Sequence, residues 1–277
     1  MNGSPRPKRK KAGRAAANKR RRRRLMAIGR LAQLSLAGLQ HAQALELPSV
    51  VAIAARLYAW NRMPVSAWRR LASEPALLAA RATGAAGTTW RQILPGPPTG
   101  PWCVWRPRAD RIETAGRHWK VYVSPRPLQL AEAVAAAMAA CEGLPVISLK
   151  YGADAQGMLR PDKLVVHLTA PEAVHLLADR LLSALGGCPA HGVPYTADLG
   201  GDGLISWGCD PPAGSPATEF GLSWRAWVTR LLAEGLASKR RPEAEPWETS
   251  LQDIERAGVD PATWAPRPWL WANADAA

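Results

Sequence analysis

The chain has 277 residues, and its 36 Lys and Arg against 22 Asp and Glu give a formal net charge of +14. Residues 1–30 hold 13 of those basic residues and no acidic one, so the rest of the chain is close to neutral. A near-neutral body argues against a large, uniformly basic surface for nucleic acid. Apolar residues make up 47% of the chain, which is enough for a hydrophobic core. No uncharged apolar run reaches the roughly 18 residues of a membrane-spanning helix.

Residues 1–24 are predicted to be a disordered basic arm. Two dense basic blocks, Lys8–Lys11 and Lys19–Arg24, repel themselves and resist folding. Such an arm is typical of non-specific contact with polyanions. A specific contact with RNA or DNA, an import signal, and a secretion or docking role are the alternatives.

Residues 25–101 are predicted to form a helical subdomain followed by a linker. Apolar residues recur at helical spacing in three segments, 25–44, 48–61 and 64–82. Pro48 and Pro64 stand where the first turn of a helix tolerates proline. Residues 83–101 are rich in Gly and Pro, which favours a linker or a surface loop.

Residues 102–239 are predicted to form an α+β domain. Strands are expected at 117–123, 145–151, 163–168 and 204–207, and helices at 127–141, 170–185 and 223–239. The order β-α-β-β-α-β is the split arrangement of a two-layer sandwich. Residues 240–277 form a C-terminal extension rich in Pro and Trp, with a short helix near 250–257.

Alternation along the first three of these strands predicts one apolar and one cationic face of the sheet. Side chains of successive strand residues point to opposite faces. The expected apolar face carries Trp119, Val121, Val123, Ile147, Leu149, Tyr151, Leu164, Val166 and Leu168. The opposite face carries His118, Lys120, Tyr122, Val146, Ser148, Lys150, Lys163, Val165 and His167, with no Asp or Glu. A plain solvated face has the same pattern. The excess of cations favours an anion site instead.

Phosphate matches this predicted face best. Arg160, in the loop before the third strand, can offer a bidentate guanidinium fork. Clustered, partly buried lysines lower one another's pKa, so one of them can act as a general base. A base, an acid and a cationic clamp together suit β-elimination of phosphate from phosphoserine or phosphothreonine.

Three stretches resemble the HopA family of type III secretion effectors and the related phospho-Ser/Thr lyases of lanthipeptide-type tailoring clusters. They are LKYGADAQGMLRPDKLVVHL at 149–168, PAHGVPYTADLGGDGLISWG at 189–208 and ERAGVDPATW at 255–264. The resemblance covers roughly residues 115–265. It implies an α+β domain that needs neither a metal nor a nucleotide. In the tailoring relatives it implies removal of phosphate from a precursor peptide that a separate kinase-like enzyme has phosphorylated.

The resemblance carries over to particular residues. Lys150 and Tyr151 match the Lys-Tyr-Gly motif, and Asp162 matches the Asp that opens the third strand. His167 departs from the pattern, which has an aromatic residue there. We therefore assign Lys150 as the base that takes the α-proton, and Tyr122 or His118 as the acid.

The remaining predicted roles complete the site. Lys120, Arg160 and Lys163 form the phosphate clamp. Tyr151, Asp162 and His167 play supporting roles, with Asp162 expected either to cap the strand or to hold a Lys or Arg. No metal ligand is assigned.

Two other functions compete with this interpretation. The first is a non-catalytic nucleic-acid-binding module that uses the arm for phosphate contacts. Such modules carry several stacked aromatics, whereas Tyr122 is the single aromatic on the polar face. The second is a secreted effector that acts by binding a host protein. The lyase is expected in the bacterial cytoplasm and the effector inside a host cell.

Overall fold

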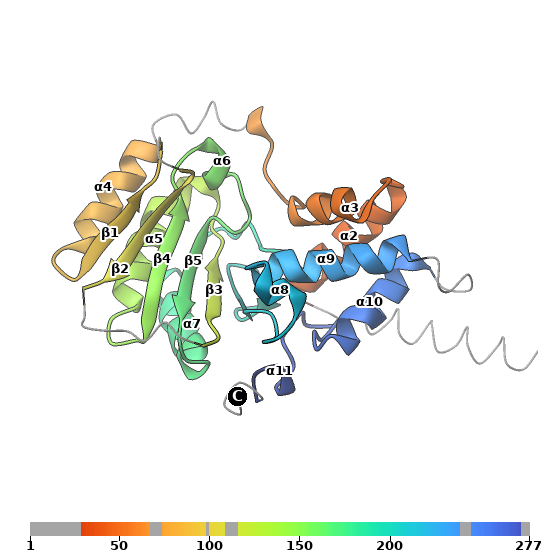
Figure 1. Cartoon of the computed structure of the whole chain (residues 1–277). Helices are drawn as coiled ribbons and strands as arrows, with labels where there is room; N and C mark the ends of the chain where they lie inside the picture. Colours follow the sequence, from red (N-terminus) through yellow and green to blue (C-terminus); the bar gives the residue numbers. More distant parts are fainter. Residues whose placement is uncertain (1–28, 67–73, 98–99, 109–115, 239–244, 273–277) are drawn as a thin grey trace, which may run out of the picture.

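A mixed α+β architecture is built around one antiparallel sheet of seven strands (Figure 1). The computed structural model describes residues 29–66, 74–97, 100–108, 116–238 and 245–272. The strands lie in the order β1-β2-β4-β5-β3-β7-β6, and every neighbouring pair is antiparallel. Their bounds are Trp90–Pro95, Trp102–Pro107, Trp119–Val123, Val146–Gly152, Leu164–Leu168, Ala197–Asp198 and Ile205–Cys209 for β1 to β7. None of the helices formed by the described residues is long and apolar enough to cross a membrane.

The predicted β-α-β-β-α-β order is confirmed. Strand β3 leads through the short helix η2 (Pro127–Gln129) into α5 (Leu130–Ala140), which is followed by β4 and β5. Helix α7 (Glu172–Ala184) then connects β5 to the last part of the sheet. A short helix, α6 (Ala155–Met158), lies in the loop between β4 and β5.

The predicted linker at 83–101 is wrong in its middle. Helix α4 (Glu74–Ala86) runs into this segment, and β1 follows at the edge of the sheet. Only Trp90 is buried in β1, so the strand lacks the alternation that identifies strands in a sequence. An edge strand has a partner on one side only, and its Gly and Pro neighbours resemble those of a loop.

The predicted N-terminal helices are present with shifted ends. They are α2 (Arg30–Ala44) and α3 (Val50–Tyr58), with Ser49 capping α3 through a hydrogen bond from the Ala52 amide. The third predicted helix, 64–82, overlaps α4, and its residues 67–73 lie outside the described ranges. The basic arm at 1–24 also lies outside them.

The apolar face of the sheet packs under α4, α5 and α7. Trp119, Val121, Val123, Leu149, Tyr151, Leu164, Val166 and Leu168 are all buried in the main core, as alternation predicts. The prediction for Val146 is wrong. The pairing of β4 with β5 shifts register between Val146 and Ser148, and Val146 joins the core. A bulge of this kind breaks the alternation that the sequence rule assumes.

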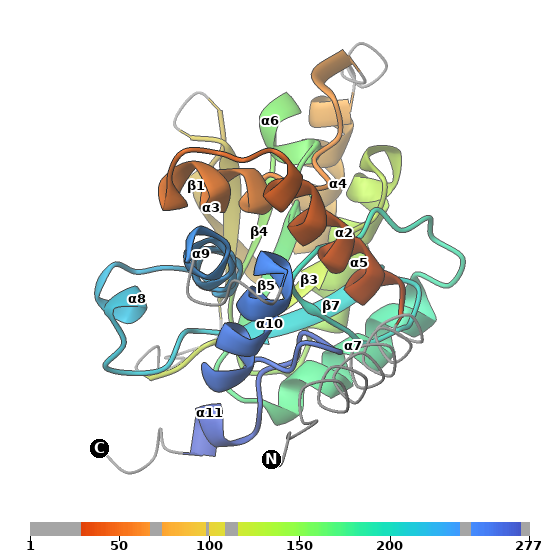
Figure 2. The same cartoon turned by 90° about the vertical axis from the view of Figure 1, so that its right-hand side faces the viewer.

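A second group of helices covers part of the opposite, polar face (Figure 2). Helix α9 (Trp224–Ala237) packs against α3 and against α10 (Pro246–Arg256), and α2 packs beside them. Helix α10 begins four residues earlier than the helix predicted in the C-terminal extension. The remaining short helices are α8 (Pro216–Glu219) and α11 (Trp269–Ala272). This helical layer therefore faces the polar side of β3, β4 and β5.

Gly208 of β7 allows α9 to approach the sheet. A Cβ atom at this position would lie 2.5 Å from Cδ1 of Trp224, the first residue of α9. Trp224 is buried, and its Nε1 donates a 3.0 Å hydrogen bond to the Tyr195 carbonyl.

We predict that Gly208→Ala lowers the free energy of unfolding by about 1–3 kcal/mol, because the added methyl group must displace a buried indole. Gly84→Ala is the control, because a Cβ at Gly84 meets no atom within 4 Å and alanine favours a helix. Urea unfolding followed by tryptophan fluorescence measures both. Equal stability of the two variants would contradict this account of the α9 contact.

Candidate functional site

A cavity of about 230 Å³ lies between the polar face of the sheet and the helical layer. The strands β2 to β5, the loop before β5, and the adjoining ends of α3 and α9 all contribute to its wall. The lining residues are Tyr58, Trp102, Lys120, Tyr122, Lys150, Arg160, Asp162, Val165, His167 and Ser223. Six of the nine predicted site residues therefore line one cavity: Lys120, Tyr122, Lys150, Arg160, Asp162 and His167.

Strand register explains why the sheet residues meet. Lys150 of β4 pairs with Val165 of β5, and Val165 pairs with Tyr122 of β3. Two residues further along β5, on the same face, His167 pairs with Lys120 of β3. Neighbouring strands lie about 4.8 Å apart, so these side chains share one patch.

The loop between β4 and β5 brings Arg160 and Asp162 to the same cavity. Gly152, the Gly of the Lys-Tyr-Gly motif, contacts Gly157 so closely that a Cβ on Gly152 would lie 2.4 Å from Gly157 Cα. The Asp154 side chain caps the intervening turn by accepting a 2.6 Å hydrogen bond from the Gly157 amide. This close backbone contact folds the loop back over the end of β4.

Asp162 is the centre of a buried ionic network. Its two carboxylate oxygens accept hydrogen bonds of 2.9 Å from Nε and Nη2 of Arg160. Nη1 of Arg225, from α9, lies 2.8 Å from Oδ2. The Tyr58 hydroxyl of α3 donates to Oδ2 at 3.3 Å. Burial alone would raise the pKa of Asp162, but the two guanidinium groups outweigh it and hold that pKa well below its usual range.

Lys120 is held by an acidic residue that was not predicted. Its ammonium forms an ion pair with Asp210, which directly follows β7. The expectation of a face without Asp or Glu is therefore wrong, since Asp162 and Asp210 both contact its cations. Alternation could not predict Asp210, because this residue lies past the end of a strand.

His118 lies outside the cavity, beside Asp210. Its backbone amide donates a 3.1 Å hydrogen bond to Asp210 Oδ2, and its ring Nδ1 lies 3.5 Å from the same oxygen. Among the two predicted acids, Tyr122 lines the cavity and His118 does not.

Lys150 differs from the other cations of the cavity. Its Nζ lies 5.0 Å from the centre of the Trp102 ring, and it forms no ion pair with any described carboxylate. Burial lowers the pKa of Lys150, and the charges of Lys120 and Arg160 lower it further, against the opposing effect of Asp162. Both effects increase the neutral amine fraction at neutral pH.

Tyr122 and His167 complete the floor of the cavity. Tyr122 is only 3% exposed, and burial raises the pKa of its hydroxyl, so the phenol stays protonated. Such a buried ring offers no stacking surface for a base. Burial, and then the charges of Lys150 and Lys120, lower the pKa of His167 well below its usual value. Its Nδ1 lies 3.2 Å from the Ser148 hydroxyl.

Two predicted residues are placed elsewhere. Lys163 is completely buried, and its Nζ lies 2.6 Å from Nδ1 of His191, away from the cavity. It precedes β5, which begins at Leu164, so alternation along that strand does not fix its direction. Tyr151 is buried in the main core, as its place on the apolar face implies.

Four further residues of the site were not predicted: Tyr58, Trp102, Arg225 and Ser223. They come from α3, β2 and the start of α9, far from the resembling stretches. The Arg160 guanidinium lies 5.1 Å from the Trp102 ring and 5.5 Å from that of Tyr58, while Arg225 lies 4.6 Å from Tyr58. These contacts keep the arginine side chains in fixed positions.

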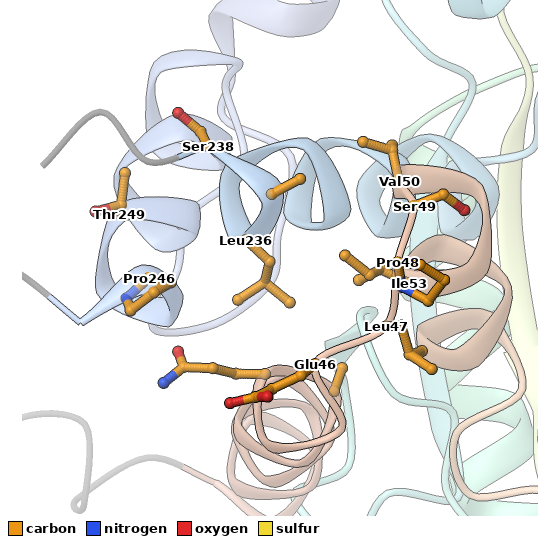
Figure 3. Close-up of a pocket in the computed structure, with 13 residues that line it drawn as sticks. Glu46, Leu47, Pro48, Ser49, Val50, Ile53, Leu236, Ser238, Pro246 and Thr249 are labelled. Carbon is orange, nitrogen blue, oxygen red and sulfur yellow. The ribbon is translucent and has the colours of Figure 1, made fainter. Parts of the chain in front are cut away.

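A roomier cavity of about 850 Å³ lies between the α2–α3 connection and the facing parts of α9 and α10 (Figure 3). Leu47, Pro48, Ile53 and Leu236 form much of its wall, and among the described lining residues only Glu46 is ionisable. It contains no predicted site residue and lacks the convergent charges of the smaller cavity.

We predict that Asp162→Asn lowers the free energy of unfolding by roughly 3–5 kcal/mol at pH 7, because it leaves the buried Arg225 without its counter-charge. Asp253→Asn breaks an exposed ion pair with Arg256 and should cost less than about 1 kcal/mol. Urea unfolding of the two variants and the wild type gives both differences.

The same network predicts a pH dependence. A lowered carboxyl pKa stabilises the fold above the unfolded-state pKa, and that contribution is lost as the pH falls. The difference in free energy of unfolding between wild type and Asp162→Asn should therefore be at its maximum at pH 6 and decrease below about pH 4. A difference that stays constant down to pH 2 would contradict the ionised network.

The architecture resembles two solved structures of bacterial proteins. One is the effector protein from Pseudomonas syringae pv. tomato strain DC3000, with a TM-score of 0.57 and 13% identity over 86% of this chain and 98% of that chain. The other is the effector protein from Pseudomonas syringae pv. syringae strain 61, with a TM-score of 0.56 and 14% identity over 86% and 99%. No family model and no curated protein matches the chain. At this identity the likeness shows that the chain shares the fold of these effector proteins.

Proposed function

We propose that the chain binds phosphorylated Ser or Thr of a peptide or protein and eliminates phosphate, leaving a dehydroamino acid. One observation carries this proposal. The small cavity gathers Lys120, Lys150 and Arg160, and Lys150 has no carboxylate partner among the described residues.

Charge and size both favour a phosphoryl group. Asp210 pairs with Lys120, whereas the single carboxylate of Asp162 pairs with both Arg160 and Arg225. The cations of these ion pairs therefore outnumber the carboxylates by one. Ser223, the N-cap of α9, also lines the cavity, and the start of a helix favours anions. A volume of about 230 Å³ is below the usual range for a whole drug-sized ligand. It suits one phosphorylated side chain, with the rest of the peptide outside.

Lys150 and Tyr122 supply a base and an acid. The neutral amine of Lys150 takes the α-proton of the phosphorylated residue. The electron pair of the Cα–H bond forms the Cα=Cβ double bond, and the Cβ–O bond breaks. The leaving phosphate receives a proton from the Tyr122 hydroxyl and departs as hydrogen phosphate. Arg160 and Lys120 stabilise the charge that grows on the leaving oxygens.

His167 supports this step without changing its charge. Because its pKa is low, the ring is neutral at pH 7 and can donate one N–H to a phosphate oxygen. Tyr122 regains its proton from solvent after the product leaves, and Lys150 releases one. This chemistry uses only side chains of the chain itself.

The proposal requires an earlier phosphorylation. We propose that a separate kinase-like enzyme supplies the phosphorylated substrate and that the basic arm adds non-specific contact with polyanions. The fold shared with two effector proteins supports a second setting for the same site. In that setting the chain is delivered into a host cell and acts on a host phosphoprotein instead of a peptide of the producing bacterium.

We predict that Lys150→Ala and Lys150→Arg both lower the elimination rate by about 10²–10⁴. Lys150→Arg keeps the charge and should retain phosphopeptide binding, which separates the base from the clamp. Arg91→Ala, an exposed position on β1, is the control and should leave the rate unchanged.

Mass spectrometry of a phosphothreonine or phosphoserine peptide measures the loss of phosphoric acid directly. Elimination by Lys150→Arg at the wild-type rate would contradict the assigned base. Binding of phosphopeptides by the wild type without any loss of phosphate would contradict the lyase and leave only recognition.

A further inference from the structure

A second cationic cavity lies next to the first. It has a volume of about 330 Å³ and is lined by residues 61–64, Arg30, Arg126, Ala190 and His191. Tyr58 of the first cavity and Asn61 of the second are three residues apart in the chain. Because consecutive Cα atoms lie 3.8 Å apart, the Cα atoms of these two residues are at most about 11 Å apart.

The charges of this second cavity are not balanced by acids. Arg30, Arg62 and Arg126 line it, and no Asp or Glu of the described residues does. Arg30 donates to the carbonyls of Asp202 and Ala190, at 3.0 and 3.5 Å. Arg62 donates a 2.8 Å hydrogen bond to the carbonyl of Gln156. These neutral acceptors orient the guanidinium groups and leave their charge uncompensated.

Arg126 completes the cationic set. Within the described ranges its side chain makes no hydrogen bond and no ion pair, and it is exposed. The N–H groups of its guanidinium are therefore available to an anion that enters the cavity. In the first cavity, by contrast, Arg160 is already bound to Asp162.

A buried lysine supports the wall. His191 Nε2 lies 2.6 Å from the Asn61 carbonyl, which can only accept, so this nitrogen carries the proton. The other ring nitrogen, Nδ1, then accepts from Nζ of Lys163 at 2.6 Å. Lys163 is completely buried and has no carboxylate partner among the described residues. Burial lowers the pKa of Lys163 to about 7, and its amine holds the imidazole of His191 in the cavity wall.

The start of α2 adds an independent feature. This helix of 15 residues begins at Arg30, and its N-cap, Gly29, supplies no side-chain hydrogen bond. The first amide groups of an uncapped helix have no intrahelical partner and favour an anion.

We propose that this second cavity binds an anionic side chain, a carboxylate or a second phosphate, of the same peptide whose phosphorylated residue enters the first cavity. The inference rests on the proposed function and specifies its substrate class as acidic phosphopeptides. An extended peptide spans about 3.3–3.6 Å per residue, so the anionic residue lies roughly two to four residues from the phosphorylated one.

Fluorescence polarisation with labelled phosphonate peptides, which bind without eliminating phosphate, tests this. Each peptide carries Glu or Gln at two, three or four residues on either side of the phosphonate residue. The wild type should bind at least one anionic peptide about tenfold more tightly than its Gln counterpart. Arg126→Ala should lose that preference and keep the affinity for Gln peptides, while the control Arg91→Ala keeps both.

Absence of any preference in the wild type, or its persistence in Arg126→Ala, would overturn the proposal. A second measurement separates it from failure of the first cavity. In the Lys150→Ala variant, inorganic phosphate should shift the Nε–Hε NMR signals of Arg30 and Arg126. No shift of those signals would overturn the second site, whatever the elimination assay gives.

Discussion

The arrangement of this molecule depends on one buried carboxylate. Asp162, just before β5, binds Arg160 of its own loop and Arg225 of α9, and accepts from Tyr58 of α3. One charged group therefore links the loop before β5 to both α3 and α9. Without it, Arg225 would be a buried cation at 1% exposure with no counter-charge. The same interaction holds the Arg160 guanidinium at the cavity wall.

This network also explains how a near-neutral body can hold a cationic pocket. The two described acids that pair with cations of the cavity are each occupied, Asp162 by two arginines and Asp210 by Lys120. Lys150 is left with an aromatic neighbour, Trp102, in place of a carboxylate. The ring orients the amine without an ion pair, so no carboxylate offsets the effect of burial, which lowers the pKa of Lys150.

Local patterning predicted the middle of the sheet and the residues that face the cavity. Lys120, Tyr122, Lys150 and His167 were found because each stands on a regular strand, where alternation fixes the face. Val146 and Lys163 were misplaced because one precedes a bulge and the other precedes its strand. Edge strand β1 was missed because only Trp90 of its residues is buried.

The remaining parts of the site depend on long-range packing. Tyr58 and Arg225 reach Asp162 from positions 104 and 63 residues away in the chain, and no local pattern encodes that meeting. Asp210 lies one residue past β7, where alternation no longer applies. The close contact of Gly152 with Gly157 folds the Arg160 loop back. The two glycines allow such a contact, but the sequence alone does not show that their backbones meet.

A crystal structure of the wild-type protein with a phosphonate analogue of a phosphoserine peptide tests the central claim most directly. The phosphonate group should lie between Lys150, Lys120 and Arg160, with the α-carbon of the analogue turned toward Lys150 Nζ. A phosphonate bound outside this cavity, or one whose α-carbon points away from Lys150, would contradict the account.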